Sequence, residues 1–167
     1  IKKQLMAFYQ FIQEQSFNRS VDELWDFISS PANLKEITPD YMGFEVITPD
    51  LPEKMYAGMI IGYQVSPMLG IKMDWLTEIT QVKEPEFFID EQRIGPYTIW
   101  HHQHHLSPLE NGVYMKDIIT YQPPLGFLGA MANGLIIDRK LKEIFSYRKN
   151  ILEKRFGIFD ANQRQKK

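Results

Sequence analysis

Residues 98–122 read TIWHHQHHLSPLENGVYMKDIITYQ, two stretches of alternating side chains on either side of Asn111-Gly112. Alternation with a period of two is typical of a β-strand with one buried face, and Asn-Gly is a strong signal for a hairpin turn. The stretch therefore predicts antiparallel strands near 98–108 and 113–122. Since successive strand residues point to opposite faces of a sheet, it also predicts which side chains share the buried face.

Further strands are predicted on the N-terminal side of this hairpin. The chain between Phe44 and Tyr121 consists of short runs rich in Ile, Val, Thr, Tyr and Trp, separated by turn-forming residues. This pattern is typical of consecutive antiparallel hairpins. The additional predicted strands lie near 5–17, 44–48, 57–66, 72–83 and 86–93.

Two short helices are predicted after the first strand. Ser20, followed three residues later by Glu23, forms a capping box, which is the signature of a helix N-terminus. Pro31 is well placed in the first turn of a second short helix, and Thr38-Pro39 ends that helix.

A long helix is predicted from about Leu128 to Phe156, where apolar residues recur at steps of three and four. Asn133-Gly134 lies near its start, as a kink or as the N-cap. The order of elements predicts an α+β fold in which a curved antiparallel sheet of about seven strands grips the C-terminal helix. We expect a single domain over residues 1–157 and a polar tail over residues 158–167.

The composition narrows the class of partner. A net charge of −2 and a pI near 6.1 give no basic excess for nucleic acid. No apolar run is long enough to form an integral membrane segment. The absence of cysteine excludes disulfides and zinc–thiolate sites and fits a cytoplasmic location. The eleven Phe, eight Tyr and three Trp could fill a large core or line a pocket.

A set of short stretches spread over residues 5–157 carries a resemblance to a known family. The stretches are Trp25-Asp26-Phe27, Ser30-Pro31-Ala32-Asn33-Leu34, Ile37-Thr38-Pro39, Tyr56-Ala57-Gly58-Met59, Trp75-Leu76-Thr77-Glu78-Ile79, Asp90-Glu91-Gln92-Arg93 with Gly95-Pro96-Tyr97, Trp100-His101-His102-Gln103-His104, Asp117 with Tyr121, and Ile144-Phe145-Ser146-Tyr147-Arg148. Together they resemble the START-like (SRPBCC) superfamily, which includes pollen-allergen-type ligand carriers and polyketide cyclase/dehydrase proteins. More narrowly, they resemble an uncharacterised bacterial subgroup often labelled cell-division-inhibitor-like. The resemblance implies a helix-grip fold with a cavity between sheet and helix, but no particular reaction.

Strand parity sorts the four clustered histidines into two pairs. Trp100, His102 and His104 share one face of their strand, and His101 and His105 share the other. The first face is the more apolar along its length, so we expect it to line the cavity. The second pair is expected to face water.

The hairpin turn sets which residues lie opposite the inward histidines. If Asn111-Gly112 forms a two-residue turn, His104 lies opposite Ile119. A turn shifted by one residue places His104 directly opposite Asp117. In both registers Asp117 shares the face of the inward histidines.

The residues expected to contact a ligand combine this polar group with aromatic and apolar neighbours on the same faces of the strands. They are Tyr63, Trp75, Asp90, Gln92, Trp100, His102, His104, Met115, Asp117 and Tyr121. Arg148 on the predicted long helix could pair with an acidic residue on the sheet, but an ordinary surface charge is the favoured interpretation.

The inward polar group leaves several interpretations open. It could be a hydrogen-bonded network that fixes strand register, or a set of anchors for a ligand in an apolar pocket. His102, His104 and Asp117 could also act as general acid and base. The pattern His102-x-His104 with Asp117 or Asp90 could hold a metal ion, but the pair alone is a weak signal, and no metal or other cofactor is assigned.

The expected function is binding of a small hydrophobic or lipid-like molecule in an internal cavity, as a carrier or sensor. The alternative is a cyclase/dehydrase-type enzyme that uses the cavity His–Asp pair as general acid and base. A third hypothesis is an interaction module, which predicts a sizeable exposed apolar patch outside the cavity mouth.

Overall fold

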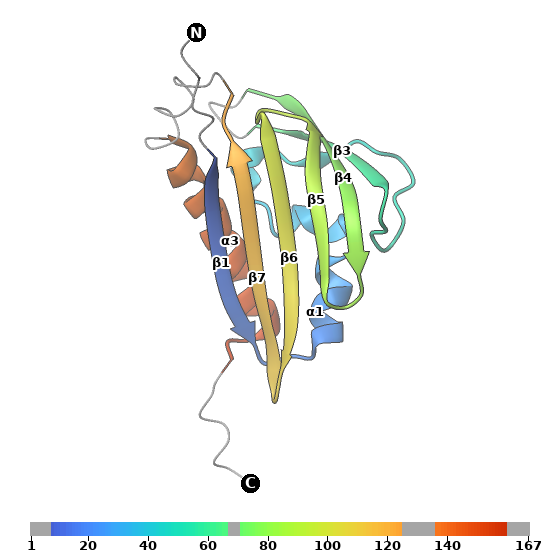
Figure 1. Ribbon diagram of the computed structural model, residues 1–167, viewed down its shortest axis with the longest axis vertical. Helices are drawn as coiled ribbons and strands as arrows, with labels where there is room; N and C mark the ends of the chain where they lie inside the picture. The colour runs from blue at the N-terminus through green and yellow to red at the C-terminus, as the bar shows by residue number, and fades with distance from the viewer. Residues whose placement is uncertain (1–7, 67–70, 125–135, 160–167) are drawn as a thin grey trace.

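The computed structural model describes residues 8–66, 71–124 and 136–159 (Figure 1). The chain order begins with a strand and three short helical segments, continues through six strands, and ends in a long helix. The elements are β1 (Tyr9–Phe17), α1 (Val21–Ile28), η1 (Pro31–Lys35), η2 (Asp40–Met42), β2 (Glu45–Val46), β3 (Met59–Val65), β4 (Met73–Lys83), β5 (Phe87–Ile94), β6 (Ile99–Leu109), β7 (Gly112–Gln122) and α3 (Asp138–Phe156).

The strands form one seven-stranded antiparallel sheet in the order β1-β7-β6-β5-β4-β3-β2. Figure 1 shows α3 along one face of this sheet, behind β1 and β7, and α1 contacts β6 and β7 near their shared turn. The sheet thus wraps around a C-terminal helix. The predicted α+β helix-grip fold is confirmed. The segments with period-two alternation form strands of one sheet, and the segment with apolar residues at steps of three and four forms the C-terminal helix.

The register of the β6–β7 hairpin differs by one residue from that of an Asn111-Gly112 turn. Leu109 pairs with Gly112, so the two turn residues are Glu110 and Asn111. A Cβ added to Gly112 would lie 2.3 Å from the carbonyl oxygen of Phe17, on the neighbouring strand β1. Gly112 is therefore required by close strand packing rather than by the turn, which a pattern along the chain does not reveal.

The helix start predicted at Ser20 is confirmed. The backbone N–H of Glu23 donates to Ser20 Oγ at 3.2 Å, and the Ser20 N–H donates to the Glu23 carboxylate at 3.0 Å. The second short helix is the 3-10 segment η1. A further 3-10 turn, η2, follows Pro39, where the sequence predicted only an end.

The long helix α3 begins at Asp138, and the part predicted between Leu128 and Leu135 lies outside the described residues. At its far end, the backbone N–H of Phe159 donates to the Ser16 carbonyl oxygen at 3.1 Å, and Ile158 bridges Phe17. The predicted polar tail therefore begins with two residues that pair with β1, and residues 160–167 lie outside the described part.

The core falls into two clusters on the side of the sheet that faces the helices. One gathers around α1 and includes Leu24, Trp25 and Met115. The other lies between β7 and α3 and includes Ile119 and Phe145. The space between these clusters is where the polar residues of β5, β6 and β7 turn inward.

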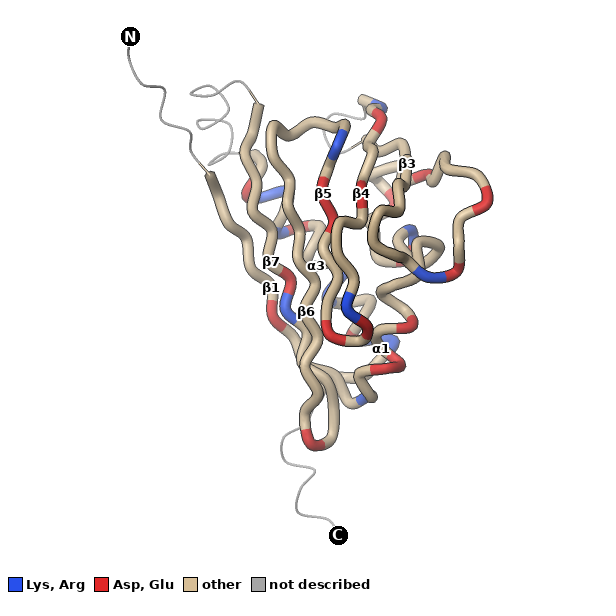
Figure 2. Tube along the Cα trace, turned by 45° about the vertical axis from the view of Figure 1, so that its right-hand side comes forward, with Lys and Arg blue, Asp and Glu red and all other residues tan. Residues whose placement is uncertain are grey.

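Charged residues of both signs are interspersed along the strands and loops (Figure 2). At the β4–β5 turn, for example, Lys83 pairs with Glu86 at 2.7 Å. None of the helices in the described ranges is both long enough and apolar enough to span a bilayer.

Candidate functional site

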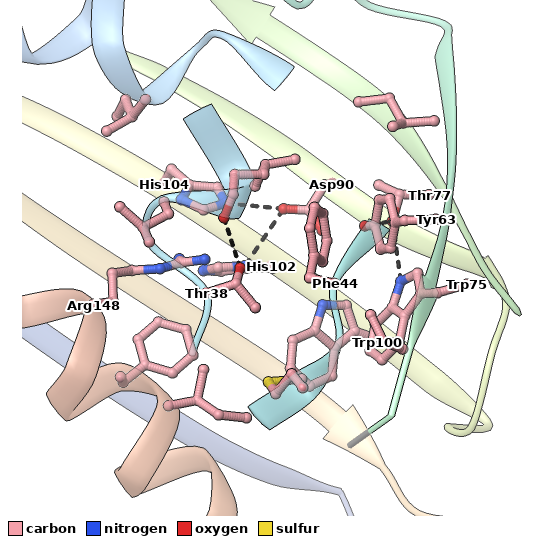
Figure 3. Close-up of a pocket in the computed structure, with 18 of the residues that line it drawn as sticks. Thr38, Phe44, Tyr63, Trp75, Thr77, Asp90, Trp100, His102, His104 and Arg148 are labelled. Atoms are coloured by element: carbon pink, nitrogen blue, oxygen red, sulfur yellow. Dashed lines mark hydrogen bonds and ion pairs between the residues drawn. The ribbon is translucent and has the colours of Figure 1, made fainter. Parts of the chain in front are cut away.

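A cavity of about 140 Å³ lies between the inner face of the sheet and α3 (Figure 3). Its walls are mostly apolar and aromatic, and they come from nearly every element of the fold. The lining residues are Ile28, Leu34, Ile37, Thr38, Met42, Phe44, Met55, Ile61, Tyr63, Val65, Trp75, Thr77, Ile79, Phe88, Asp90, Tyr97, Trp100, His102, His104, Met115, Leu141, Ile144, Phe145 and Arg148.

One end of the cavity is built from packed aromatic rings. The ring of Trp100 lies 5.3 Å from that of Trp75 and 4.9 Å from that of Tyr97, measured between centroids. Tyr63 stacks on the far side of Trp75 at 6.3 Å. Period-two alternation places Trp75 and Trp100 on the inner faces of β4 and β6, where they form an apolar wall.

The polar atoms of Tyr63, Trp75 and Thr77 bind one another at this aromatic end. Trp75 Nε1 donates to Thr77 Oγ1 at 3.1 Å, and the Tyr63 hydroxyl also hydrogen-bonds Thr77 Oγ1. Burial raises the pKa of Tyr63, so its hydroxyl stays protonated. Around Tyr63 and Trp75 the cavity is therefore bordered by ring faces whose polar atoms are already hydrogen-bonded.

The opposite end holds two histidines between two carboxylates. Asp117 Oδ1 lies 3.2 Å from His102 Nε2 and 2.8 Å from His104 Nδ1. Asp90 Oδ2 lies 3.4 Å from His102 Nδ1 and 2.9 Å from His104 Nε2. Every ring nitrogen of both histidines thus faces a carboxylate oxygen, and we call these four residues the His–Asp ring.

Sheet register explains why the His–Asp ring closes. Asp90 on β5 pairs directly with His102 on β6, and His104 pairs directly with Asp117 on β7. The register shifted by one residue is therefore the one realised. Asp117 has no exposed surface, and both histidines are buried.

The outward pair of histidines is confirmed as a separate set. His101 Nδ1 lies 3.0 Å from Glu91 Oε1 on the outer face of the sheet, and Glu91 also pairs with Arg93 at 3.1 Å. His105 Nε2 lies 2.9 Å from Gln103 Oε1. Strand parity therefore separates the four clustered histidines as predicted.

The two inner histidines have opposite pKa shifts. Burial and the neighbouring His104 lower the pKa of His102 to about 4. Burial also lowers the pKa of His104, but hydrogen bonds to Asp117 and Asp90 outweigh it and raise this pKa above its ordinary value. Near pH 6.5 the His–Asp ring therefore contains a neutral His102 and a charged His104.

The two carboxylates remain ionised in this environment. Burial by itself raises the pKa of Asp117, but hydrogen bonds from His102 and His104 outweigh it and hold the pKa below its usual range. Burial likewise raises the pKa of Asp90, and the attraction of the same two histidines outweighs it, so its pKa is also lowered.

These shifts apply to the protein without any bound metal ion. They predict that its free energy of unfolding has a maximum near pH 6.5. Below this pH, His102 binds a proton in the unfolded chain but stays neutral in the folded protein until about pH 4. Stability therefore decreases as the pH is lowered from 6.5 toward 4. Above pH 6.5, the stabilising proton on His104 is lost as the pH rises through the raised folded pKa. Below about pH 4, the unfolded chain also binds protons at Asp90 and Asp117, whose folded pKa values are lowered, so further stability is lost.

Urea unfolding in the presence of a chelator, repeated between pH 4.5 and 8.5, measures this dependence. We expect losses on the order of 2 kcal/mol on the acid side. The variant His101→Gln should show the same dependence of stability on pH, because His101 lies on the outer face and is not part of the His–Asp ring. A stability that rises steadily with pH across this range would contradict the opposed shifts.

Arg148 on α3 also lines the cavity, which corrects its interpretation as an ordinary surface charge. Its guanidinium lies 4.9 Å from the centre of the Phe145 ring, and Figure 3 shows it directed toward the inner histidines. Its Nε is buried and has no hydrogen-bond partner among the described residues. The cationic side chain of Arg148 therefore belongs to the polar end of the cavity, beside the inner histidines.

Several of the predicted ligand-contacting residues lie beside the cavity rather than on its wall. Gln92 Nε2 donates to the Tyr97 carbonyl at 2.7 Å, which ties the side chain to the β5–β6 turn. Tyr121 stacks on Tyr9 at 5.7 Å within the α3 cluster. Asp117 lies behind the two histidines. The remaining predicted residues are on the wall: Tyr63, Trp75, Asp90, Trp100, His102, His104 and Met115.

The sequence did contain signals for some of the wall residues that were missed. Thr77 lies two residues after Trp75 along β4, so strand parity places both on one face. Arg148 follows Ile144 by four residues and Phe145 by three, which places it on the apolar stripe of α3. Tyr97, which lies in the β5–β6 turn, had no such periodic signal.

No protein-family model and no curated protein matches this chain. Solved structures do resemble it. Protein Ms6760 from Mycobacterium smegmatis is 19% identical, with a TM-score of 0.62 over 87% of this chain and 88% of that chain. Major latex-like protein 151 from Panax ginseng is 10% identical, with a TM-score of 0.61 over 89% and 97%. Ara h 8.0201 is 14% identical, with a TM-score of 0.55 over 88% and 99%. These similarities show a shared helix-grip fold of the START-like kind.

Proposed function

We propose that this protein binds a small hydrophobic molecule in the cavity between the sheet and α3, as a carrier or sensor. The observation that carries the proposal is the cavity itself, with an aromatic end and a single polar end (Figure 3). Ligand pockets commonly combine apolar walls with a few polar groups that orient the ligand. The helix-grip fold shared with the ginseng protein and Ara h 8.0201 supports this function, because the sheet and helix enclose the space.

The size of the cavity supports a compact ligand. A volume of about 140 Å³ is close to that of an apolar engineered cavity of roughly 150 Å³ that takes up benzene. The rings of Trp75, Tyr97 and Trp100 offer flat faces for such a molecule. A single ring fits the cavity in its present form, whereas a long lipid chain requires the walls to move apart.

The polar end supports a ligand that carries an acceptor oxygen. The Nε–H of Arg148 is buried and unpaired among the described residues, and an unmet buried donor costs about 1–3 kcal/mol. A carbonyl, hydroxyl or carboxylate oxygen on the ligand would be attracted to the Arg148 guanidinium, which lines this end of the cavity. The other nearby polar groups, His102 and His104, are already bound to carboxylates.

The cyclase/dehydrase alternative has less support from the geometry. A general base needs a nitrogen lone pair within reach of the substrate proton. The ring nitrogens of His102 and His104 all face Asp90 or Asp117 instead. An interaction module has less support, because exposed large apolar side chains of the described residues include members near opposite edges of the sheet, such as Ile12 on β1 and Ile60 on β3.

Blocking the cavity should weaken ligand binding. Acetophenone, one ring with a carbonyl oxygen, is a suitable probe and should raise the melting temperature by about 5–10 °C at a hundredfold excess over Kd. Ile144 on α3 lines the cavity and is half-buried, so Ile144→Trp can extend its ring into the space. We expect acetophenone affinity in this variant to fall at least about tenfold, a loss of about 1.4 kcal/mol.

Ser146→Trp provides the matched control, because Ser146 is an exposed residue of the same helix. Its affinity for acetophenone should equal that of the unmodified protein. Calorimetric titration and thermal unfolding measure both variants. Equal binding by Ile144→Trp would place the probe outside the cavity. A lack of binding by the unmodified protein, tested also with toluene and decanoic acid, would contradict the proposed function.

A further inference from the structure

We propose that Asp90, His102 and His104 form a binding site for a divalent transition-metal ion, with one coordination position open to the cavity. The proposal does not depend on the hydrophobic ligand, because the three residues converge whether or not the cavity is filled. One candidate ligand atom from each of the three lies within 4.8 Å of the other two. Figure 3 shows dashed lines from the imidazoles of His102 and His104 meeting at the Asp90 carboxylate.

The distances are close to those of a metal coordination sphere. Ligand atoms about 2.0–2.1 Å from a tetrahedral ion lie about 3.3 Å from one another. Asp90 Oδ2 is 3.4 Å from His102 Nδ1 and 2.9 Å from His104 Nε2. Small side-chain rotations therefore bring all three atoms to coordinating distance without any change in the strands.

The count of hydrogen-bond donors leaves room for a cation at this point. Two neutral imidazoles have two N–H groups, but the His–Asp ring contains four nitrogen–oxygen contacts. If both N–H groups donate to Asp117, the nitrogen lone pairs of His102 and His104 both face Asp90. One additional proton satisfies only one of these two contacts, whereas a metal ion satisfies both.

Asp117 supplies the outer partner that metal-binding histidines usually have. Histidine ligands commonly donate their second N–H to a carboxylate, which fixes the tautomer and orients the ring. Asp117 Oδ1 is 3.2 Å from His102 Nε2 and 2.8 Å from His104 Nδ1, and Asp117 is fully buried. This contact leaves Nδ1 of His102 and Nε2 of His104 as the ligand atoms.

The neighbouring strands make this arrangement rigid. Asp90 and His102 are direct partners across β5 and β6, and His104 and Asp117 are direct partners across β6 and β7. Sites built on such paired strands hold their geometry better than sites on loops. The side chain of Asp90 is only 15% exposed, so little water competes for the ion.

The donor set indicates the kind of ion. Two imidazoles and one carboxylate are typical ligands of Zn²⁺ and Fe²⁺, whereas Ca²⁺ and Mg²⁺ prefer sites made of oxygen atoms. With two carboxylates, one divalent ion and Arg148, the local formal charge is +1. The fourth ligand at the open position is therefore expected to be an anionic oxygen, such as hydroxide or a carboxylate.

Co²⁺ titration of chelator-treated protein is a direct test. We expect one equivalent to bind and to give the intense visible absorption of a four- or five-coordinate site, and Zn²⁺ to displace it. Asp90→Asn and His102→Asn should each weaken binding at least about 100-fold, and Asp117→Asn about 10–100-fold. Mg²⁺ in large excess should not displace Co²⁺.

His101→Asn and His105→Asn are the matched controls, because these residues lie on the same strand but face outward. Both should bind Co²⁺ like the unmodified protein, and circular dichroism checks that every variant is folded. An unmodified protein that shows no visible Co²⁺ bands would overturn the proposal, even if a variant fails to fold. Binding that survives in His102→Asn and is lost in His101→Asn would also overturn it. Acetophenone binding without metal keeps the proposed function separate from this result.

Discussion

The substitution Asp117→Asn is expected to lower the free energy of unfolding by about 3–5 kcal/mol in chelator-treated protein. Asp117 is fully buried, and its Oδ1 is the only carboxylate atom of that residue within reach of His102 and His104 among the described contacts. A neutral amide of the same size removes one of the two counter-charges of the charged His104 and leaves only Asp90, at 2.9 Å. Removing one partner of a buried ion pair costs much more than losing a surface pair, because the remaining charge stays out of water.

Urea unfolding at pH 6.5 measures this loss. Lys116→Ala is the matched control, since Lys116 is the adjacent strand residue on the opposite face and pairs with exposed Glu14 at 2.9 Å. We expect the control to change stability only slightly, because an exposed ion pair is screened by water. Similar losses in the two variants would mean that the inner network contributes no more than a surface pair.

The substitution Trp100→Ala is expected to have the second large effect. Truncating a packed tryptophan costs about 3–5 kcal/mol, and the lower end applies here because Trp100 is only partly buried. Its ring contacts those of Trp75 and Tyr97, so its removal widens the aromatic end of the cavity. The variant should therefore be less stable and should accept a larger ligand.

Thermal unfolding with acetophenone and with the two-ring molecule 2-acetylnaphthalene separates these effects. The larger molecule should stabilise Trp100→Ala more than it stabilises the unmodified protein, since a ligand that binds only the folded state raises its stability. Ile99→Ala is the control, because Ile99 is the preceding residue on the outer face and is 37% exposed. A preference for the smaller probe in Trp100→Ala would show that Trp100 does not border the ligand.

The features of the site that could be predicted from the sequence are those set by local periodicity. Alternation along β6 placed His102 and His104 with Trp100, and it placed His101 and His105 on the other face. This division is a property of a single strand and needs no knowledge of its neighbours. The capping box at Ser20 is local in the same way.

Contacts between distant parts of the chain could not be predicted in this way. The pairing of His104 with Asp117 depends on a hairpin register that Phe17 on β1 helps to set through its close approach to Gly112. The periodicity of α3 predicts that Arg148 lies on its apolar stripe. It does not predict that this stripe covers the His–Asp ring. Gln92 likewise shares the inner face, yet its side chain binds the backbone of Tyr97.

The sequence by itself therefore determined the order of the elements, the helix-grip class and the face on which each strand residue lies. These follow from repeats of two and of three to four residues, which are written along the chain. Only the tertiary structure decided the strand register, the closed His–Asp ring and the size of the cavity. Those depend on side chains that are far apart in sequence and are held at distances of a few ångströms by the packing of sheet against helix.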